Sequence, residues 1–167
     1  MKKTLILGLG NPILADDGVG IHVVRALAAH SLPAGVVLTE GCVGGLRLLE
    51  IIPGYDQVIL VDAIQTPDGH PGEIFPLQPG ALRNPLHSGS AHDLSLSGAL
   101  CLGRELGMAI PEDTDIRIIA IQVADVRTLD EELTPAVKAA IPRAVEAVLT
   151  LLEKDPVCPF PLVEGEL

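Results

Sequence analysis

Apolar runs and amphipathic stretches alternate along most of the chain. Four largely apolar runs predict buried β-strands, at residues 4–9, 36–39, 57–63 and 116–123. A shorter strand at 72–77 is expected beside the main sheet. Apolar residues spaced by three and four predict helices at 19–29, 46–52, 92–106 and 135–154. Strands that alternate with helices indicate an α/β fold, a three-layer sandwich with a mostly parallel central sheet and helices on both faces. The run at 57–63 is the expected central strand.

The composition supports this architecture. Hydrophobic residues make up 48% of the 167 positions, but aromatic residues only 2%, so Leu, Ile, Val and Ala must build the core. That mixture is typical of a parallel sheet buried between helices. We expect a single domain over residues 1–154 and a Pro-rich acidic tail over 155–167.

Charge narrows the classes of partner. The chain carries 22 acidic residues against 11 Lys and Arg, a formal charge of -11, so it should repel nucleic acid and anionic lipid. No apolar run approaches the about 20 residues that cross a bilayer. Three cysteines without close spacing fit a reducing compartment, and we expect a cytoplasmic protein. Residues 4–9 follow two lysines as in a short signal peptide, but a first buried strand explains the same pattern.

Polar residues follow the predicted strands one after another. Asp16 and Asp17 come after the first strand, Glu40 ends the second, Asp62 ends the third, and His92 opens the helix after a loop. In open parallel sheets, ligands bind outside the carboxyl ends of the strands. The sequence therefore predicts a functional site at that edge.

Three of these residues make a plausible set of metal ligands. Asp17, Asp62 and His92 offer carboxylate oxygens and one imidazole nitrogen, which suit a divalent ion such as nickel, zinc or manganese. Each also has a structural interpretation. Asp17 could cap a helix, Asp62 could accept hydrogen bonds from loop N–H groups, and His92 could be the first residue of a helix without binding a ligand. The residues alone leave these alternatives open.

The glycine turn after the first strand admits a different interpretation. Gly8 and Gly10 resemble the start of a dinucleotide-binding loop, but Ile13 stands where the third glycine belongs. Two adjacent carboxylates, Asp16 and Asp17, would also repel a pyrophosphate. The pattern argues against a nucleotide site.

A set of short motifs, in order, resembles one protein family. The motifs are Gly8 to Gly20, Glu40-Gly41 leading into Gly44-Gly45, Val61-Asp62-Ala63, Pro71-Gly72-Glu73-Ile74, and Ser90-Ala91-His92-Asp93-Leu94. Together they resemble the hydrogenase maturation endopeptidases, although Glu40 stands where that family commonly has Asp.

The resemblance implies a substrate and a metal. The family's metal-contacting positions match Asp17, Asp62 and His92, which would bind nickel supplied by the substrate rather than held permanently. The partner would be the precursor of a nickel–iron hydrogenase large subunit, and the reaction would remove its C-terminal extension once nickel is installed. We expect a monomer that meets this precursor transiently.

The chemistry of cleavage stays open at this point. One hypothesis is that a carboxylate, Asp16 or Glu40, activates water near a nickel ion that acts as Lewis acid. Another gives nickel a positioning role alone.

Two rival functions also fit part of the sequence. Peptidyl-tRNA hydrolases share the run from Gly8 to Pro12, but they need a His-Asn pair, and this chain's charge does not suit tRNA. A nickel-binding or nickel-sensing accessory module without protease activity could use the same three ligands.

Overall fold

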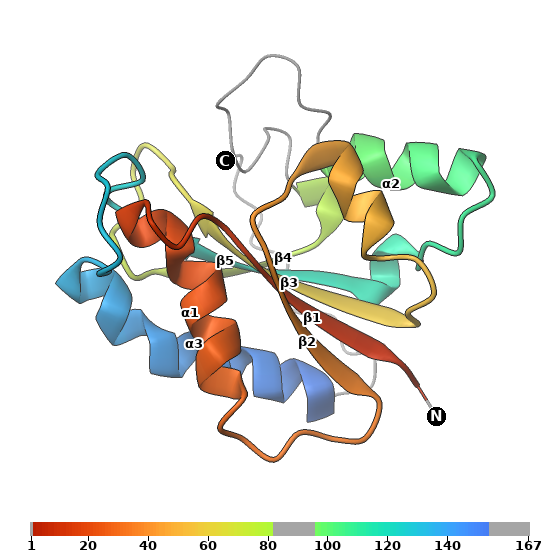
Figure 1. Cartoon of the computed structure of the whole chain (residues 1–167), viewed down its shortest axis with the longest axis horizontal. Helices are drawn as coiled ribbons and strands as arrows, with labels where there is room; N and C mark the ends of the chain where they lie inside the picture. Colours follow the sequence, from red (N-terminus) through yellow and green to blue (C-terminus); the bar gives the residue numbers. More distant parts are fainter. Residues whose placement is uncertain (1, 82–95, 154–167) are drawn as a thin grey trace.

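Five strands and three α-helices form the fold in a computed structural model, which describes residues 2–81 and 96–153 (Figure 1). The strands are β1 (Thr4–Leu9), β2 (Val36–Gly41), β3 (Gln57–Ile64), β4 (Ile74–Leu77) and β5 (Ile116–Gln122). The helices are α1 (Val19–Leu27), α2 (Leu96–Glu105) and α3 (Pro135–Glu153). Short 3-10 segments are η1 (Ala15–Gly18), η2 (Gly45–Glu50), η3 (Pro79–Ala81) and η4 (Asp113–Asp115). The predicted tail at 155–167 and the segment that carries His92 lie outside the described residues.

The sheet has the order β2-β1-β3-β5-β4. The first four strands are parallel, and β4 pairs antiparallel with β5 at the edge. Every residue of the central strand β3 is buried, as its apolar run predicts. The carboxyl ends of β1, β2, β3 and β5 therefore meet at one edge of the sheet.

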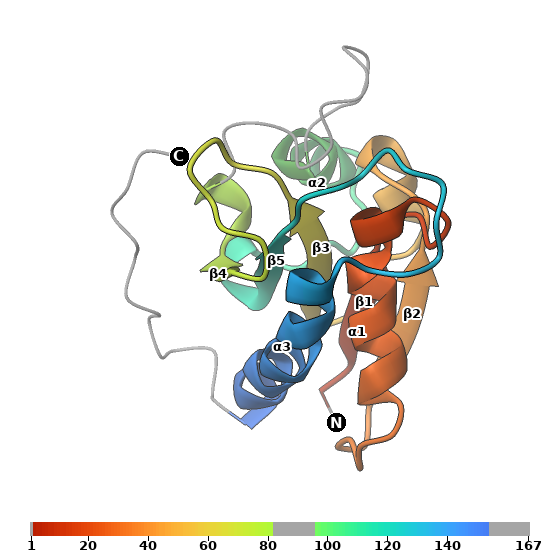
Figure 2. The same cartoon turned by 90° about the vertical axis from the view of Figure 1, so that its left-hand side faces the viewer.

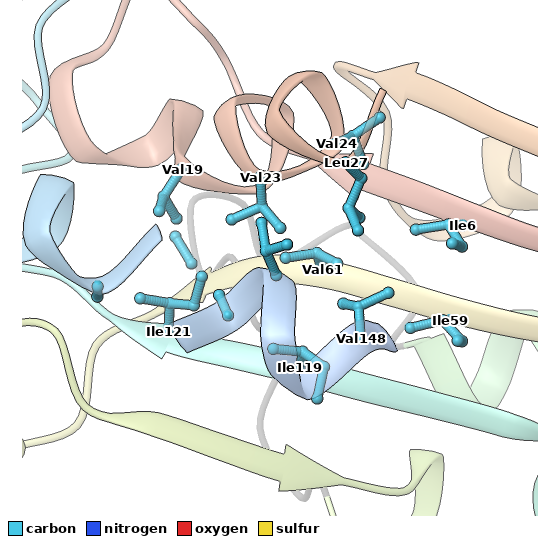
Figure 3. Packing of buried hydrophobic residues seen from close by; sticks show 14 of the residues in the cluster. Ile6, Val19, Val23, Val24, Leu27, Ile59, Val61, Ile119, Ile121 and Val148 are labelled. Carbon is cyan, nitrogen blue, oxygen red and sulfur yellow. The ribbon is translucent and has the colours of Figure 1, made fainter. Parts of the chain in front are cut away.

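Helices cover both faces, which confirms the predicted α/β sandwich. Figure 2 shows α1 and α3 on one side of the sheet and α2 on the other. Alternate residues of β3 face the two helical layers. Ile59 and Val61 pack with α1 and α3. Val58 and Leu60 pack with η2 and α2. Figure 3 shows this first layer from close by, with valines of α1 and α3 packed against isoleucines of the sheet. Each such buried aliphatic side chain contributes roughly 1.5–3 kcal/mol.

The structure differs from the sequence prediction in three places. The strand predicted beside the main sheet is its antiparallel edge strand, where Pro76 is tolerated. The short helix predicted at 46–52 is the 3-10 segment η2. Asp62 was predicted to end its strand, but β3 continues to Ile64 because it stays paired with β5 as far as Gln122.

Long apolar helices are absent from the described part of the chain. No helix within residues 2–81 and 96–153 is long and apolar enough to cross a membrane.

Candidate active site

Asp17 lies in η1, directly after the glycine turn that follows β1. Its side chain is buried, and its Oδ2 accepts a 2.7 Å hydrogen bond from the backbone N–H of Asn11. The turn passes so close to η1 that a Cβ on Gly10 would lie 1.8 Å from the carbonyl oxygen of Asp17. Gly10 also has a φ of 127°, a conformation that favours glycine. The glycine turn therefore seats Asp17 against the end of β1.

Asp62 comes from the neighbouring strand β3. It is only 1% exposed, and its Oδ1 accepts a 2.8 Å hydrogen bond from the N–H of Ala63. Side chains alternate along a strand, so Asp62 projects to the same face as Leu60, the face that α2 covers. A carboxylate inside a central strand is costly to bury, which marks this position as unusual.

Close packing brings the segments that carry Asp17 and Asp62 together. A Cβ on Gly20 would lie 2.2 Å from the carbonyl oxygen of Val61 and 2.4 Å from that of Leu9, so α1 begins directly against β1 and β3. The preceding segment η1 contacts β3 as well. The two predicted carboxylate ligands thus sit on contacting elements near the carboxyl edge of the sheet.

Asp16 points away from solvent into the loop that follows β5. Its carboxylate is 0% exposed. Oδ2 accepts hydrogen bonds from the N–H groups of Ala124 and Asp125, both at 3.1 Å, and from the Thr134 hydroxyl at 2.9 Å. Oδ1 accepts one from the Thr134 N–H at 2.7 Å. This geometry favours a structural role for Asp16, and the hypothesis that Asp16 or Glu40 activates water stays a prediction.

Glu40 lies at the carboxyl end of β2, paired with Gly8 of β1. The Arg25 guanidinium of α1 donates two hydrogen bonds to its carboxylate, each 2.9 Å long. These bonds and the positive charge of Arg25 lower the pKa of Glu40, against the opposing effect of burial. The Glu40 side chain is 41% exposed, so water reaches it.

The predicted third ligand, His92, lies outside the described residues. Among residues 2–81 and 96–153 alone, no three His, Cys, Asp or Glu side chains are arranged to hold a metal ion. A test of the proposed metal set therefore has to include His92.

Sequence reasoning missed the partners of both candidate catalytic acids. Thr134 precedes Pro135, a combination that signals a helix start, but nothing in the sequence links it to Asp16. Arg25 reads as an ordinary exposed helix residue, and only the packing of α1 beside β2 brings it to Glu40.

The chain is an open-sheet α/β protein. Its candidate functional residues, including the buried Asp17 and Asp62, lie near the carboxyl ends of the parallel strands. Residues 21–151 match the family described as hydrogenase maturation protease, HycI. The chain is 31% identical over 166 residues to the Hydrogenase 2 maturation protease of Escherichia coli (strain K12), covering 95% of this chain and 96% of that protein.

Solved structures agree with this match. The hydrogenase maturating endopeptidase HybD from E. coli superposes with a TM-score of 0.75 and 30% identity, over 90% of this chain and 91% of that one. The [NiFe] hydrogenase maturation protease HybD from Thermococcus kodakarensis gives a TM-score of 0.61 and 27% identity, over 90% and 99% of the two chains. The chain belongs to the hydrogenase maturation protease family and is an endopeptidase, as the sequence motifs predicted.

Proposed function

We propose that this endopeptidase recognises nickel in the precursor of a nickel–iron hydrogenase large subunit and removes the precursor's C-terminal extension. The observation that carries the proposal is the pair of buried carboxylates, Asp17 and Asp62, on contacting elements near the carboxyl edge of the sheet. Buried carboxylates are favourable when a positive charge or a metal ion compensates them. The nickel ion belongs to the substrate.

His92 would complete the contact with nickel. It stands four residues before Leu96, the first residue of α2, and α2 packs on the face toward which Asp62 projects. Two carboxylates and an imidazole are ligands that nickel accepts, and a precursor without the metal would gain none of these contacts. This difference in affinity makes nickel insertion the signal for cleavage.

Glu40 is the better of the two carboxylate candidates for activating water. Its side chain is 41% exposed, whereas every hydrogen bond of Asp16 described above ties it to the loop after β5 and the start of α3. Arg25 keeps Glu40 ionised by lowering the pKa of its carboxyl group. The Glu40 carboxylate would therefore be a weak proton acceptor, but it would orient a water molecule by hydrogen bonding. In this proposal the nickel ion polarises the scissile carbonyl or the attacking water.

A cleavage experiment tests the function. Cognate large-subunit precursor, prepared with and without nickel, is incubated with the protein, and its mass is measured over time. We expect loss of a C-terminal peptide from the nickel-loaded form only. Equal cleavage of both forms would contradict nickel recognition, and an intact precursor in both arms would contradict the proposed reaction.

Two variants test the role of Glu40. We expect Glu40→Gln to slow cleavage of the loaded precursor by about 10²-fold or more, as removal of a group that orients a reactant does. A normal cleavage rate in both Glu40→Gln and Asp16→Asn would contradict any role for these carboxylates in water activation. Nickel would then act by positioning the substrate.

A further inference from the structure

Two large apolar side chains stand exposed on neighbouring loops at the carboxyl edge of the sheet. Ile13, after β1, is 50% exposed, and Leu129, after β5, is 77% exposed. Single exposed apolar residues are ordinary on protein surfaces, so their number alone indicates nothing. Ile13 and Leu129, however, lie on loops that contact each other and adjoin the candidate site.

The two loops pair through a short parallel bridge. Leu14 pairs with Asp130, and the N–H of Asp130 donates a 3.1 Å hydrogen bond to the carbonyl of Ile13. The N–H of Ala15 returns one of 2.7 Å to the carbonyl of Asp130. These bonds hold the backbones of Ile13 and Leu129 on adjacent segments, and both side chains are exposed. We call this exposed pair the apolar ledge.

Hydrogen bonds fix the two loops that carry the ledge. The Asp16 carboxylate accepts four hydrogen bonds from the loop after β5 and the start of α3, and the Asp16 N–H donates a 2.9 Å bond to the carbonyl of Asp125. Asp125 accepts two further bonds within the same loop, from the N–H groups of Arg127 and Thr128. A surface fixed before binding loses little conformational entropy when a partner arrives.

The ledge also adjoins the candidate site. The N–H of Asp17 donates a 3.0 Å hydrogen bond to the carbonyl of Leu14, so the ligand segment and the ledge are parts of one turn. Figure 2 shows the loop after β5 running alongside the segment that carries η1. A polypeptide held at the Asp17 site would therefore have these loops beside it.

Charge indicates what kind of segment would bind. Exposed Asp130 and Glu131 border the ledge, whereas Glu132 pairs with Lys138 at 2.9 Å and Arg127 stands two residues before Leu129. Acids still outnumber bases in this loop, and the chain's formal charge is -11. A complementary partner presents apolar side chains beside basic ones. We propose that Ile13 and Leu129 form the docking ledge for an apolar, basic segment of the hydrogenase large-subunit precursor next to its scissile bond. The proposal rests on the function proposed above.

Steady-state cleavage of nickel-loaded precursor tests the ledge. We expect the double variant Ile13→Ser with Leu129→Ser to raise KM about tenfold or more, with kcat changed less than about twofold, because the lost contacts hold substrate rather than the reacting atoms. Leu106→Ser is the matched control. Leu106 is 67% exposed, and it lies near the amino edge, where Gly54 and Ala109 are joined by a 2.9 Å backbone hydrogen bond. The KM of the Leu106→Ser variant should equal that of the unaltered protein.

Two charge-reversal variants test whether the docked segment of the precursor is basic. We expect Glu131→Lys to raise KM at low ionic strength, and Glu153→Lys to leave it unchanged. Glu153 ends α3, about 27 Å along the helix from its first residue. An unchanged KM in the double serine variant would overturn the ledge. An unchanged KM in Glu131→Lys would overturn the basic character of the segment.

Direct binding separates failure of the ledge from failure of the proposed function. If the unaltered protein cleaves no precursor, the affinity of immobilised precursor for each variant still tests docking. Binding that weakens in the double serine variant but not in Leu106→Ser would support the ledge without cleavage. Binding equal in all three proteins would overturn it.

Discussion

At the scale of single residues, the adjacent acids Asp16 and Asp17 have different surroundings. Asp17 accepts a bond from the turn after β1, whereas Asp16 accepts all its described bonds from residues more than a hundred positions away. The Asp17 side chain is bonded to the glycine turn beside the candidate site, and the Asp16 side chain is bonded to the loop after β5. Each role predicts a different response to mutation.

Replacing the Asp16 carboxylate should cost stability. In Asp16→Asn, an amide NH₂ would face N–H donors, leaving buried groups unpaired, so we expect the free energy of unfolding to fall by about 3 kcal/mol. Thr134→Val removes only the hydroxyl donor and should cost about 1 kcal/mol. Urea denaturation measures both, and the exposed Asp68→Asn should stay within about 0.5 kcal/mol of the unaltered protein. Equal stability of Asp16→Asn and Asp68→Asn would contradict the fastening role.

The ion pair of Glu40 predicts a pH dependence. Arg25 lowers the pKa of Glu40 below its ordinary value of 4.5, so the pair's contribution to stability is complete above pH 4.5. This contribution is lost as the pH falls through the folded-state pKa. We expect a carboxyl-carbon NMR titration to place the Glu40 midpoint below 4.5, and Arg25→Gln to move it back toward that value. A midpoint at 4.5 in the unaltered protein would exclude the ion pair in solution.

At the scale of elements, the glycine turn between β1 and η1 controls where Asp17 lies. A methyl group on Gly10 would overlap the Asp17 carbonyl and would also meet an unfavourable φ of 127°. We expect Gly10→Ala to lower the melting temperature by about 10 °C, corresponding to about 3 kcal/mol, and to abolish cleavage. Gly44→Ala is the control, because Gly44 has a φ of -148° and open space around its Cβ position. A Gly10→Ala protein as stable as Gly44→Ala would contradict the close approach.

Elements buried on both sides were predictable, and short irregular ones were not. The run at 57–63 identified β3 as the central strand because a strand covered on both faces must be apolar throughout. The apolar spacing at 46–52 is compatible with an α-helix, but the segment η2 forms 3-10 turns, and so short a segment takes its form from its packing. The position of Asp17 and Asp62 at one edge followed from strand order, whereas the partners of Asp16 and Glu40 depend on tertiary contacts.

At the scale of the whole molecule, a formal charge of -11 on a 17.5 kDa chain disfavours self-association. We propose that the protein is a monomer when free. Sedimentation equilibrium at moderate salt should return a mass of 17.5 kDa over a wide range of concentrations. A mass of twice that value, independent of dilution, would contradict the proposal.

We propose that Asp17, Asp62 and His92 together recognise the nickel ion of the precursor. The most direct measurement is the rate of C-terminal peptide release from nickel-loaded precursor, followed by mass spectrometry, for Asp17→Ala, Asp62→Ala, His92→Ala and the control Asp68→Ala. Loss of a metal ligand typically lowers affinity or activity by at least about 10²-fold, so we expect the first three variants to fall that far and the control to cleave normally. If any of the first three variants retains the control's rate and its preference for loaded precursor, that residue does not contact the nickel, which would contradict the proposed three-residue site.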